Sequence, residues 1–277
     1  MSDNYFEGYY FKHQAGDNTV AFIPGRAKDK AFVQVITNEH AYFYNFPKIE
    51  LKDRVVAGSC EFSTEGIKID LPDIQGEIQY SELVPIKYDI MGPFKYLPME
   101  CRHGVISIHH KLSGSLTIDD QKVLFDNGIG YIEKDSGCSF PKSYLWLQCS
   151  DEKMSSMVSI AKIPFLGLKF WGCICVIYFD GREYRLATYL GVKIINASEN
   201  KIVLKQGRYL LEIDIKPGTS QCLPAPKNGI MQGMIRESNN SFARFKFYYT
   251  DELIFDVQSQ NAGFEYVNMG GPPPATS

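Results

Sequence analysis

Two carboxylates lie two residues apart in the segment Gly130-Tyr-Ile-Glu-Lys-Asp135, near the middle of the chain. If this segment is a strand, Glu133 and Asp135 share one face and Lys134 lies on the other. A carboxyl group in apolar surroundings is hard to ionise, so it can hold a proton near neutral pH and donate it. The alternative is that Glu133 and Lys134 form ion pairs with other charges between two halves of the protein. Glu7 has the same two interpretations, an acid or a buried ion-pair partner.

Three histidines, His103, His109 and His110, fall in one predicted strand. His103 and His109 would face the same way, but six residues of strand span about 20 Å, so they cannot share one metal ion unless the strand bends sharply. We expect these two histidines to form hydrogen bonds in a ligand cavity or at its rim, or else to be ordinary buried histidines at an interface. A metal-binding pair of Cys101 and His103 is a further option.

Two aromatic segments have the spacing of strand residues that share a face. Trp146 and Gln148 lie two apart, as do Tyr9 and Phe11. In a barrel these faces point inward. Each side chain is therefore either part of a filled core or part of the wall around an apolar ligand.

Composition narrows the classes of function. The chain has 277 residues, 44% of them hydrophobic, and a net charge of −3, so there is material for one large core or two and no basic excess that predicts a nucleic-acid partner. The beginning of the sequence lacks the pattern of a signal peptide, and seven cysteines, an odd count, indicate reduced thiols and a cytoplasmic location.

The longest apolar stretch, 163–179, is broken by Pro164 and Lys169, and we expect a loop leading into a buried strand. The phosphate-loop, dinucleotide, zinc-protease and nucleophile-elbow motifs are all absent from the sequence.

Short apolar or alternating runs bounded by Gly, Asn, Asp and Pro recur along the whole sequence. This pattern predicts an all-β protein with a barrel or sandwich architecture. Asp180-Gly181, between two apolar runs, predicts a hairpin turn. The expected strands are 5–12, 31–37, 40–46, 66–71, 104–113, 143–149, 172–179, 184–190, 202–205, 209–215, 242–249 and 253–258.

The two halves of the sequence resemble each other. Val20-Ala-Phe-Ile-Pro-Gly matches Ile160-Ala-Lys-Ile-Pro-Phe, and Gly66-Ile-Lys-Ile-Asp matches Leu210-Leu-Glu-Ile-Asp at similar spacing. Gly130-Tyr-Ile-Glu133 near the end of the first half matches Gly263-Phe-Glu265 near the end of the second. Shared order and near-constant spacing indicate an internal duplication. We expect two lipocalin-like β-barrel or sandwich halves, residues 1–135 and 136–269, followed by a flexible tail, 270–277.

Three stretches carry a resemblance to a known family. They are Tyr5-Phe-Glu-Gly-Tyr-Tyr-Phe-Lys12, Gly130-Tyr-Ile-Glu-Lys-Asp-Ser-Gly-Cys-Ser-Phe-Pro141 with the following Tyr144-Leu-Trp-Leu-Gln148, and Gly263-Phe-Glu265. Together with Cys101-Arg-His103, they resemble the tocopherol cyclase family, whose members have two lipocalin-like domains, and the chain looks like a bacterial member. Tyr9 and Ser136 stand where that family usually has tryptophan, which puts the identity of the substrate in doubt more than the fold.

The resemblance implies an enzyme that closes a chromanol ring by adding the phenol of a prenylated quinol, or of a related isoprenoid, across an alkene. Such a reaction needs an acid in a dry site, with no metal or cofactor. Asp135, Glu133 and Glu7 are the candidate catalytic acids. Candidate substrate-binding residues are Tyr9, Phe11, His103, His109, Trp146 and Gln148.

Two other functions stay open at this point. One is a non-catalytic binder or carrier of an apolar lipid or isoprenoid, which the loss of the two tryptophans favours. The other is a structural scaffold with filled cores. In the first two interpretations the partner is an apolar small molecule, with a transient membrane-surface contact left open and the oligomeric state undetermined by the sequence.

Overall fold

The computed structural model describes residues 4–28, 30–165 and 168–269, and the predicted tail, 270–277, lies outside the described residues. The chain divides into two compact units. Unit 1 comprises Met1–Ile86, Met99–Phe140 and Leu223–Met234, and unit 2 comprises Lys87–Pro98, Pro141–Cys222 and Ile235–Ser277. Each unit therefore includes a short segment from the opposite half of the sequence. The division after residue 135, which makes each half continuous, stays a prediction.

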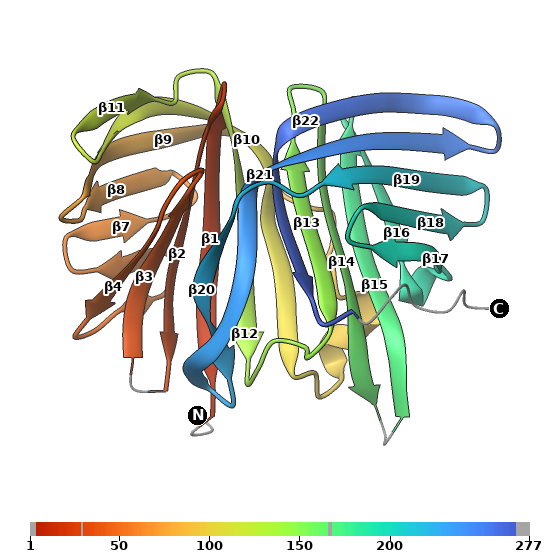
Figure 1. The fold of residues 1–277 in the computed structure, drawn as a ribbon, viewed down its shortest axis with the longest axis horizontal. Helices are drawn as coiled ribbons and strands as arrows, with labels where there is room; N and C mark the ends of the chain where they lie inside the picture. Colours follow the sequence, from red (N-terminus) through yellow and green to blue (C-terminus); the bar gives the residue numbers. More distant parts are fainter. Residues whose placement is uncertain (1–3, 29, 166–167, 270–277) are drawn as a thin grey trace. The chain divides into compact units, whose positions relative to one another are not determined.

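The first sheet curls around an apolar core (Figure 1). Its strands run in the order β4-β3-β2-β1-β12-β10-β9-β8-β7-β6-β5, with β11 beside β10. The two edge strands, β4 and β5, are consecutive in the sequence. The strands are β1 (Phe6–Ala15), β2 (Asn18–Ala27), β3 (Lys30–Thr37), β4 (Ala41–Phe46), β5 (Glu50–Leu51), β6 (Val55–Ala57), β7 (Cys60–Phe62), β8 (Gly66–Asp70), β9 (Ile74–Val84), β10 (Cys101–Ile118), β11 (Gln121–Leu124) and β12 (Gly128–Gly137).

The second sheet has the order β16-β15-β14-β13-β22-β21-β19-β18-β17, with β20 beside β21. Here too the edge strands, β16 and β17, are consecutive strands of the chain, joined through the short 3-10 helix η2 (Thr188–Leu190). Its strands are β13 (Tyr144–Ser150), β14 (Met154–Phe165), β15 (Leu168–Phe179), β16 (Arg182–Ala187), β17 (Lys193–Ser198), β18 (Lys201–Gln206), β19 (Tyr209–Lys216), β20 (Ser220–Lys227), β21 (Ile230–Tyr249) and β22 (Glu252–Val267).

The same connectivity occurs twice. In each sheet the opening strand, β1 or β13, lies between the strand that follows it and the last strand of the sheet, β12 or β22. That last strand then pairs with a long strand, β10 or β21. Two of the sequence matches agree with this order, because they align β2 with β14 and β12 with β22. The third is off by one strand: Gly66–Asp70 is β8, which β9 separates from β10, whereas Leu210–Asp214 lies in β19, which pairs directly with β21. The structure thus confirms the all-β class with two lipocalin-like halves related by an internal repeat.

Strict alternation along the central strands decides which side chains enter each core. In unit 1 the core contains Phe11 of β1 and Ile132 of β12. In unit 2 it contains Leu145 and Leu147 of β13 and Phe264 of β22. Neighbouring residues on these strands therefore point to the opposite face of the sheet. The candidate carboxylates at positions 133 and 135 alternate with core residue Ile132, so they lie on the face away from the core.

Most of the expected strands are present, with two corrections. Residues 163–179 are not a loop feeding one strand, because 163–165 complete β14 and 168–179 form β15, while 166–167 lie outside the described residues. The expected strand 184–190 ends at Ala187, and η2 follows, with Gly191 in the left-handed region at φ 81°. Asp180 and Gly181 have φ values of 50° and 71°, which confirms the predicted hairpin turn between β15 and β16.

Among the described residues, neither of the short helices has the length and apolar character that crossing a membrane requires.

Candidate functional site

The candidate site begins with three alternate residues of β12. Tyr131, Glu133 and Asp135 lie on the face of the first sheet away from the unit 1 core, as the spacing of the two carboxylates predicts. Strand β10 pairs with β12 so that His103 lies directly opposite Asp135. The long-range pairing thus adds a histidine to the two carboxylates.

The four side chains form a continuous polar cluster. His103 donates its Nδ1–H to Asp135 Oδ1 at 2.8 Å. Its other ring nitrogen, Nε2, lies 3.2 Å from Glu133 Oε2. The Tyr131 hydroxyl donates to the same Glu133 oxygen at 2.5 Å. One imidazole therefore lies between two carboxylates, and one of these carboxylates also accepts a phenolic hydrogen bond.

Tyr131 and Glu133 are buried, His103 and Asp135 are partly buried, and this burial controls the electrostatics of the cluster. Glu133 is only 4% exposed and Tyr131 only 1%, so water screens these groups little. Burial by itself lowers the pKa of His103, but the carboxylates of Glu133 and Asp135 outweigh it and hold this pKa well above its ordinary value. Burial, reinforced by Glu133, raises the pKa of the Tyr131 hydroxyl well above its ordinary value. The cluster can therefore keep a proton on His103 beside Glu133, which is the arrangement a proton-transfer group needs.

Cys101 borders this cluster. Its Sγ lies 3.8 Å from Asp135 Oδ1. Burial raises the pKa of the Cys101 thiol well above its ordinary value, and the charge of Asp135 adds to the effect. The thiol therefore stays protonated, and the pair that the sequence suggested as a metal site, Cys101 and His103, is joined instead through Asp135.

Glu7 lies on the opposite face of the first sheet from Glu133. Its carboxylate accepts from Arg26 at 3.0 Å and forms an ion pair with Lys134 at 2.5 Å. Lys134 also places its ammonium 4.8 Å from the centre of the Tyr9 ring. Because Lys134 alternates with Glu133 along β12, Glu7 and Glu133 project from different sides of the sheet. The structure thus places Glu7 in an ion-paired group separate from the cluster around His103.

Tyr9 and Phe11 accompany Glu7 on the core side. Their rings stack with centroids 6.0 Å apart, and Phe11 contacts the ring of Phe62 in the unit 1 core. His109 is on β10, but register shifts separate it from His103, and its Cα partner is Val84 of β9. The structure therefore brings neither aromatic residue nor His109 to the cluster.

Trp146 and Gln148 belong to unit 2. Both are buried on the face of β13 away from the core, since Leu145 and Leu147 alternate with them and lie in it. Trp146 is the Cα partner of Glu265 on β22, and Gln148 donates to Ser150 Oγ at 2.9 Å. The second half therefore has its own buried polar strip around Glu265.

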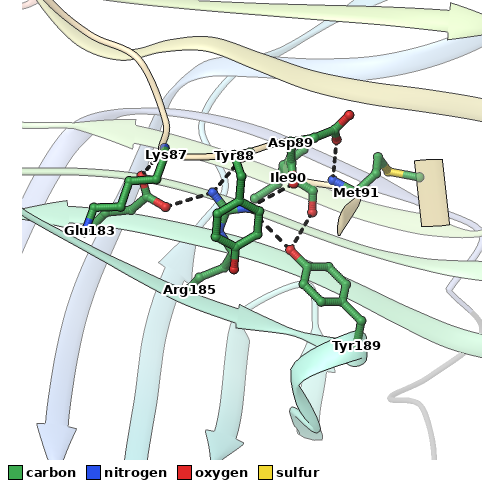
Figure 2. A network of polar contacts seen from close by, with 8 residues as sticks. All are labelled: Lys87, Tyr88, Asp89, Ile90, Met91, Glu183, Arg185 and Tyr189. Atoms are coloured by element: carbon green, nitrogen blue, oxygen red, sulfur yellow. Dashed lines mark hydrogen bonds and ion pairs between the residues drawn. The ribbon is translucent and has the colours of Figure 1, made fainter. Parts of the chain in front are cut away.

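Unit 2 contains a second polar network, centred on Arg185, that the sequence did not predict. Figure 2 shows Arg185 holding the segment 87–91 through main-chain carbonyls: its guanidinium donates to the oxygens of Tyr88 and Asp89 at 2.9 and 3.0 Å. It also pairs with Glu183 at 2.8 Å and stacks on the Tyr88 ring at 3.6 Å. A network whose acceptors are main-chain carbonyls produces no pattern of side chains in the sequence, so it cannot be predicted from residue types. These contacts fasten the segment 87–91 to β16 within unit 2.

The residues able to hold a metal ion coincide with the unit 1 cluster. His103, Glu133 and Asp135 offer one ligand atom each within 4.8 Å of one another, and this is the one such group of three among the described residues. Tyr131, which the sequence analysis did not single out, completes the cluster. Its position two residues before Glu133 was the available signal, because alternate strand residues share a face.

Comparisons with known proteins identify the fold but not the family. No protein-family model and no curated protein matches the sequence. A crystal structure of CghA aligns with a TM-score of 0.63 at 10% identity, covering 98% of this chain and 90% of that chain. Kievitone hydratase from Nectria haematococca aligns with a TM-score of 0.54 at 12% identity, over 95% and 88% of the two chains. A structure described as a putative AttH from Nitrosomonas europaea gives 0.52 at 11% identity, over 96% and 92%. The two-half fold is thus shared along nearly the entire chain.

Proposed function

We propose that this protein is an enzyme of the cyclase or hydratase type, which adds an O–H group across a carbon–carbon double bond of an apolar substrate. The observation that carries the proposal is the imidazole of His103, whose side chain is only 11% exposed, between the carboxylates of Glu133 and Asp135. Adding O–H to an unactivated alkene requires a proton donor in a water-poor site, and general acids of this kind contribute about 10²–10⁴-fold to rate.

In the proposed reaction Glu133 delivers the proton. The proton resides on His103, passes to the Glu133 carboxylate 3.2 Å away, and moves from there to the alkene carbon, leaving a tertiary cation on the substrate. An oxygen lone pair of the nucleophile forms the new C–O bond, and the proton that this oxygen loses returns to the His103–Glu133 pair. Asp135 keeps the imidazole in place through its 2.8 Å hydrogen bond. The protein ends the cycle in its starting protonation state.

The nucleophile defines the two versions of the reaction. If the oxygen belongs to a phenol of the same substrate, the product is an isomer with a chromanol ring, and the resemblance of the motifs around Glu7 and Glu133 to tocopherol cyclases supports a prenylated quinol as substrate. If the oxygen belongs to water, the product is a hydrate. A similar fold in a protein named kievitone hydratase supports this second version. We propose the prenylated quinol as the first substrate to test.

The test uses the full-length protein with prenylated benzoquinols of several chain lengths in D₂O. The expected product is either an isomer or a hydrate that carries one deuterium on carbon, because the transferred proton exchanges with solvent while it resides on His103 or Glu133. Glu133→Gln keeps the shape of the side chain and removes the acid, so we expect its turnover to fall by about 10²-fold or more. Glu39→Gln, at a side chain that is 84% exposed, is the matched control and should leave turnover unchanged.

Two outcomes would contradict this function. One is turnover that Glu133→Gln leaves intact. The other is a lack of any product with every chain length, together with an apolar molecule that co-purifies with the protein and can be extracted from it. The second result would favour the carrier function, with an isoprenoid or other lipid as the partner.

A further inference from the structure

The hairpin of β14 and β15 extends beyond the neighbouring strand β13 (Figure 1). Strand β13 pairs with β14 only as far as Ala161, and β16 pairs with β15 only from Ile174 onward. Within the described part of the chain, Lys162–Pro164 and Lys169–Trp171 therefore form strand pairs only with each other. We call these six residues the ribbon. A two-stranded ribbon is marginally stable in water by itself, so one that projects from a sheet needs a partner or a function.

The 3-10 helix η1 (Gly92–Tyr96) packs against the ribbon within unit 2. The centre of the Phe94 ring lies 6.3 Å from the centre of the Phe170 ring in the ribbon and 5.9 Å from that of the Tyr189 ring. Arg185 fastens the preceding segment to β16, which holds η1 in this position. The ribbon and η1 thus form one surface, which we call the aromatic end of unit 2.

The aromatic end carries exposed apolar side chains. Tyr96 is 80% exposed, more than any other large hydrophobic residue that the structure describes. Pro93 and Pro164 are also exposed, and Ile163 and Trp171 are partly exposed. A group of apolar side chains that faces water marks a surface that associates with a membrane or with another protein.

Every charged side chain of the aromatic end is a lysine. The ribbon contains Lys162 and Lys169, and η1 contains Lys95, although the whole chain has a net charge of −3. The Lys162 ammonium lies 5.7 Å from the centre of the Trp171 ring, and the Lys95 ammonium lies 5.0 Å from that of the Tyr96 ring. Tryptophan and tyrosine beside lysine are typical of surfaces at a membrane interface, where the rings enter the headgroup layer and the ammonium groups meet anionic phosphates.

We propose that the aromatic end of unit 2 docks on the surface of an anionic phospholipid bilayer. Charge complementarity selects this partner. In the network beside η1, Asp89 and Glu183 balance Lys87 and Arg185, so the three lysines determine the charge of the surface (Figure 2). The face of an anionic bilayer is negative, and each lysine close to it strengthens binding about fivefold.

Docking goes beyond the proposed function and does not depend on it, because no residue of the aromatic end belongs to the cluster around His103. The two ideas are nevertheless compatible. A prenylated substrate dissolves in a bilayer, so docking would bring the protein to the place where such a substrate is found.

The experiment measures co-sedimentation of the full-length protein with two kinds of vesicle. One contains phosphatidylcholine and phosphatidylglycerol in equal amounts, and the other contains phosphatidylcholine alone. We expect binding to the anionic vesicles, much weaker binding to the neutral ones, and release at high salt. The double variant Lys162→Gln/Lys169→Gln should bind the anionic vesicles about 25-fold more weakly. Tyr96→Ser should also weaken binding, and this residue is too exposed for the change to disturb folding.

The matched control is the double variant Lys205→Gln/Lys216→Gln. It removes the same charge from two exposed lysines elsewhere in unit 2, on β18 and β19. Lys216, like Lys162, holds its ammonium over an aromatic ring, 5.5 Å from the centre of Phe242. We expect this variant to bind the anionic vesicles within about twofold of wild type, because its lysines lie outside the aromatic end.

Trp171 reports directly whether the ribbon enters the bilayer. Lipids brominated on their acyl chains quench the fluorescence of a tryptophan that reaches the headgroup boundary. We expect such vesicles to quench the wild-type protein and to leave Trp171→Phe, which retains Trp146, unquenched.

Three results would overturn the proposal. The first is folded wild-type protein that binds neither kind of vesicle. The second is anionic binding that the control variant loses as fully as Lys162→Gln/Lys169→Gln does, which would show a general effect of charge. The third is a dimer that Tyr96→Ser dissociates, without vesicle binding, because the aromatic end would then join two copies of the chain. Docking without turnover of any prenylated substrate would establish the surface and refute the enzyme function, and turnover without docking would do the reverse.

Discussion

Acidification is expected to destabilise unit 1 through a histidine that lies far from the carboxylate cluster in the sequence. His13 of β1 is completely buried in the unit 1 core, against the rings of Phe22 and Phe125. Its Nε2 is 2.5 Å from the Tyr80 hydroxyl. Burial lowers the pKa of His13 from 6.5 to about 3, with a backbone hydrogen bond to Val20 acting in the opposite direction. The ring is therefore neutral in the folded protein throughout the range in which an unfolded chain would protonate it.

The size of the effect follows from this difference in pKa. Between pH 6.5 and about 3 the unfolded chain binds a proton at His13 that the folded chain does not, so the free energy of unfolding decreases as the pH falls through this window. At about 1.36 kcal/mol per pKa unit, the full effect is about 5 kcal/mol, of which about 2.5 kcal/mol falls between pH 6 and pH 4. Above about pH 7.5 the contribution of His13 is constant, because both states are then neutral. His110, whose pKa burial also lowers well below its ordinary value, acts in the same direction.

The assay is urea unfolding at several pH values between 4 and 8, compared between wild type and His13→Gln. Circular dichroism follows the whole chain, whereas tryptophan fluorescence follows unit 2, because Trp146 and Trp171 are the two tryptophans and both lie there. The glutamine side chain can form a hydrogen bond with the Tyr80 hydroxyl but does not titrate. We expect the variant to lose about 2.5 kcal/mol less than wild type between pH 6 and pH 4. The substitution also changes stability at pH 8, so the comparison concerns the slope.

The control is His40→Gln, which removes an exposed histidine and should leave the slope unchanged. If His13→Gln and wild type lose stability in parallel as the pH falls, the burial argument for His13 is wrong. If His40→Gln flattens the slope as much as His13→Gln does, the titrating group has been misassigned.

Three further perturbations have definite expected results. Arg185→Ala leaves the carbonyls of Tyr88 and Asp89 and the Glu183 carboxylate without their buried partner, so we expect urea unfolding to show a loss of about 3–5 kcal/mol. Arg54→Ala removes an exposed ion pair with Glu61 and should leave the unfolding midpoint nearly unchanged. Gly130→Ala would press its methyl group against the buried ring of His110, and we expect a loss of about 1–3 kcal/mol in the free energy of unfolding. Gly104→Ala has room and should be tolerated, and equal stability of the two variants would contradict the packing argument. Tyr131→Phe removes the hydrogen bond to Glu133. Because a hydrogen bond to a charged group is worth about 1.5–3 kcal/mol, we expect turnover in the deuterium assay to fall about tenfold to a hundredfold. Unchanged turnover would show that Tyr131 has no part in the reaction.

The fold was predictable because it depends on local periodicity. Alternation of apolar and polar residues decides which face of a strand is buried, and the Asp180-Gly181 pair decides where a hairpin turns. The same alternation predicts that Glu133 and Asp135 share a face. Residues 163–165 were misassigned because Pro164 suggested a loop, but it lies in β14 opposite Lys169, one residue before the strand ends.

The site was only partly predictable, because the pairing register of distant strands creates it. His103 meets Asp135 only because β10 pairs with β12 in one particular register, and two register shifts along β10 separate it from His109. No pattern within either segment encodes that alignment. Glu7 was grouped with Glu133 on the strength of motifs alone, whereas the pairing of β1 with β12 places them on opposite faces. Arg185 was beyond sequence reasoning because its partners are mostly main-chain carbonyls, which every residue has.

The internal repeat also indicates which half carries the proposed chemistry. Glu265 is the counterpart of Glu133. Glu265 accepts a hydrogen bond from the Tyr144 hydroxyl, and Glu133 accepts one from the Tyr131 hydroxyl. The neighbouring strand differs, because Glu265 lies opposite a second glutamate, Glu237. All five histidines of the chain precede residue 111, and none belongs to unit 2. Two adjacent carboxyl groups can share a proton, but the imidazole that lies between Glu133 and Asp135 in unit 1 has no histidine counterpart in unit 2. The duplication thus preserved the glutamate in both halves, and the proton relay that we propose exists in unit 1.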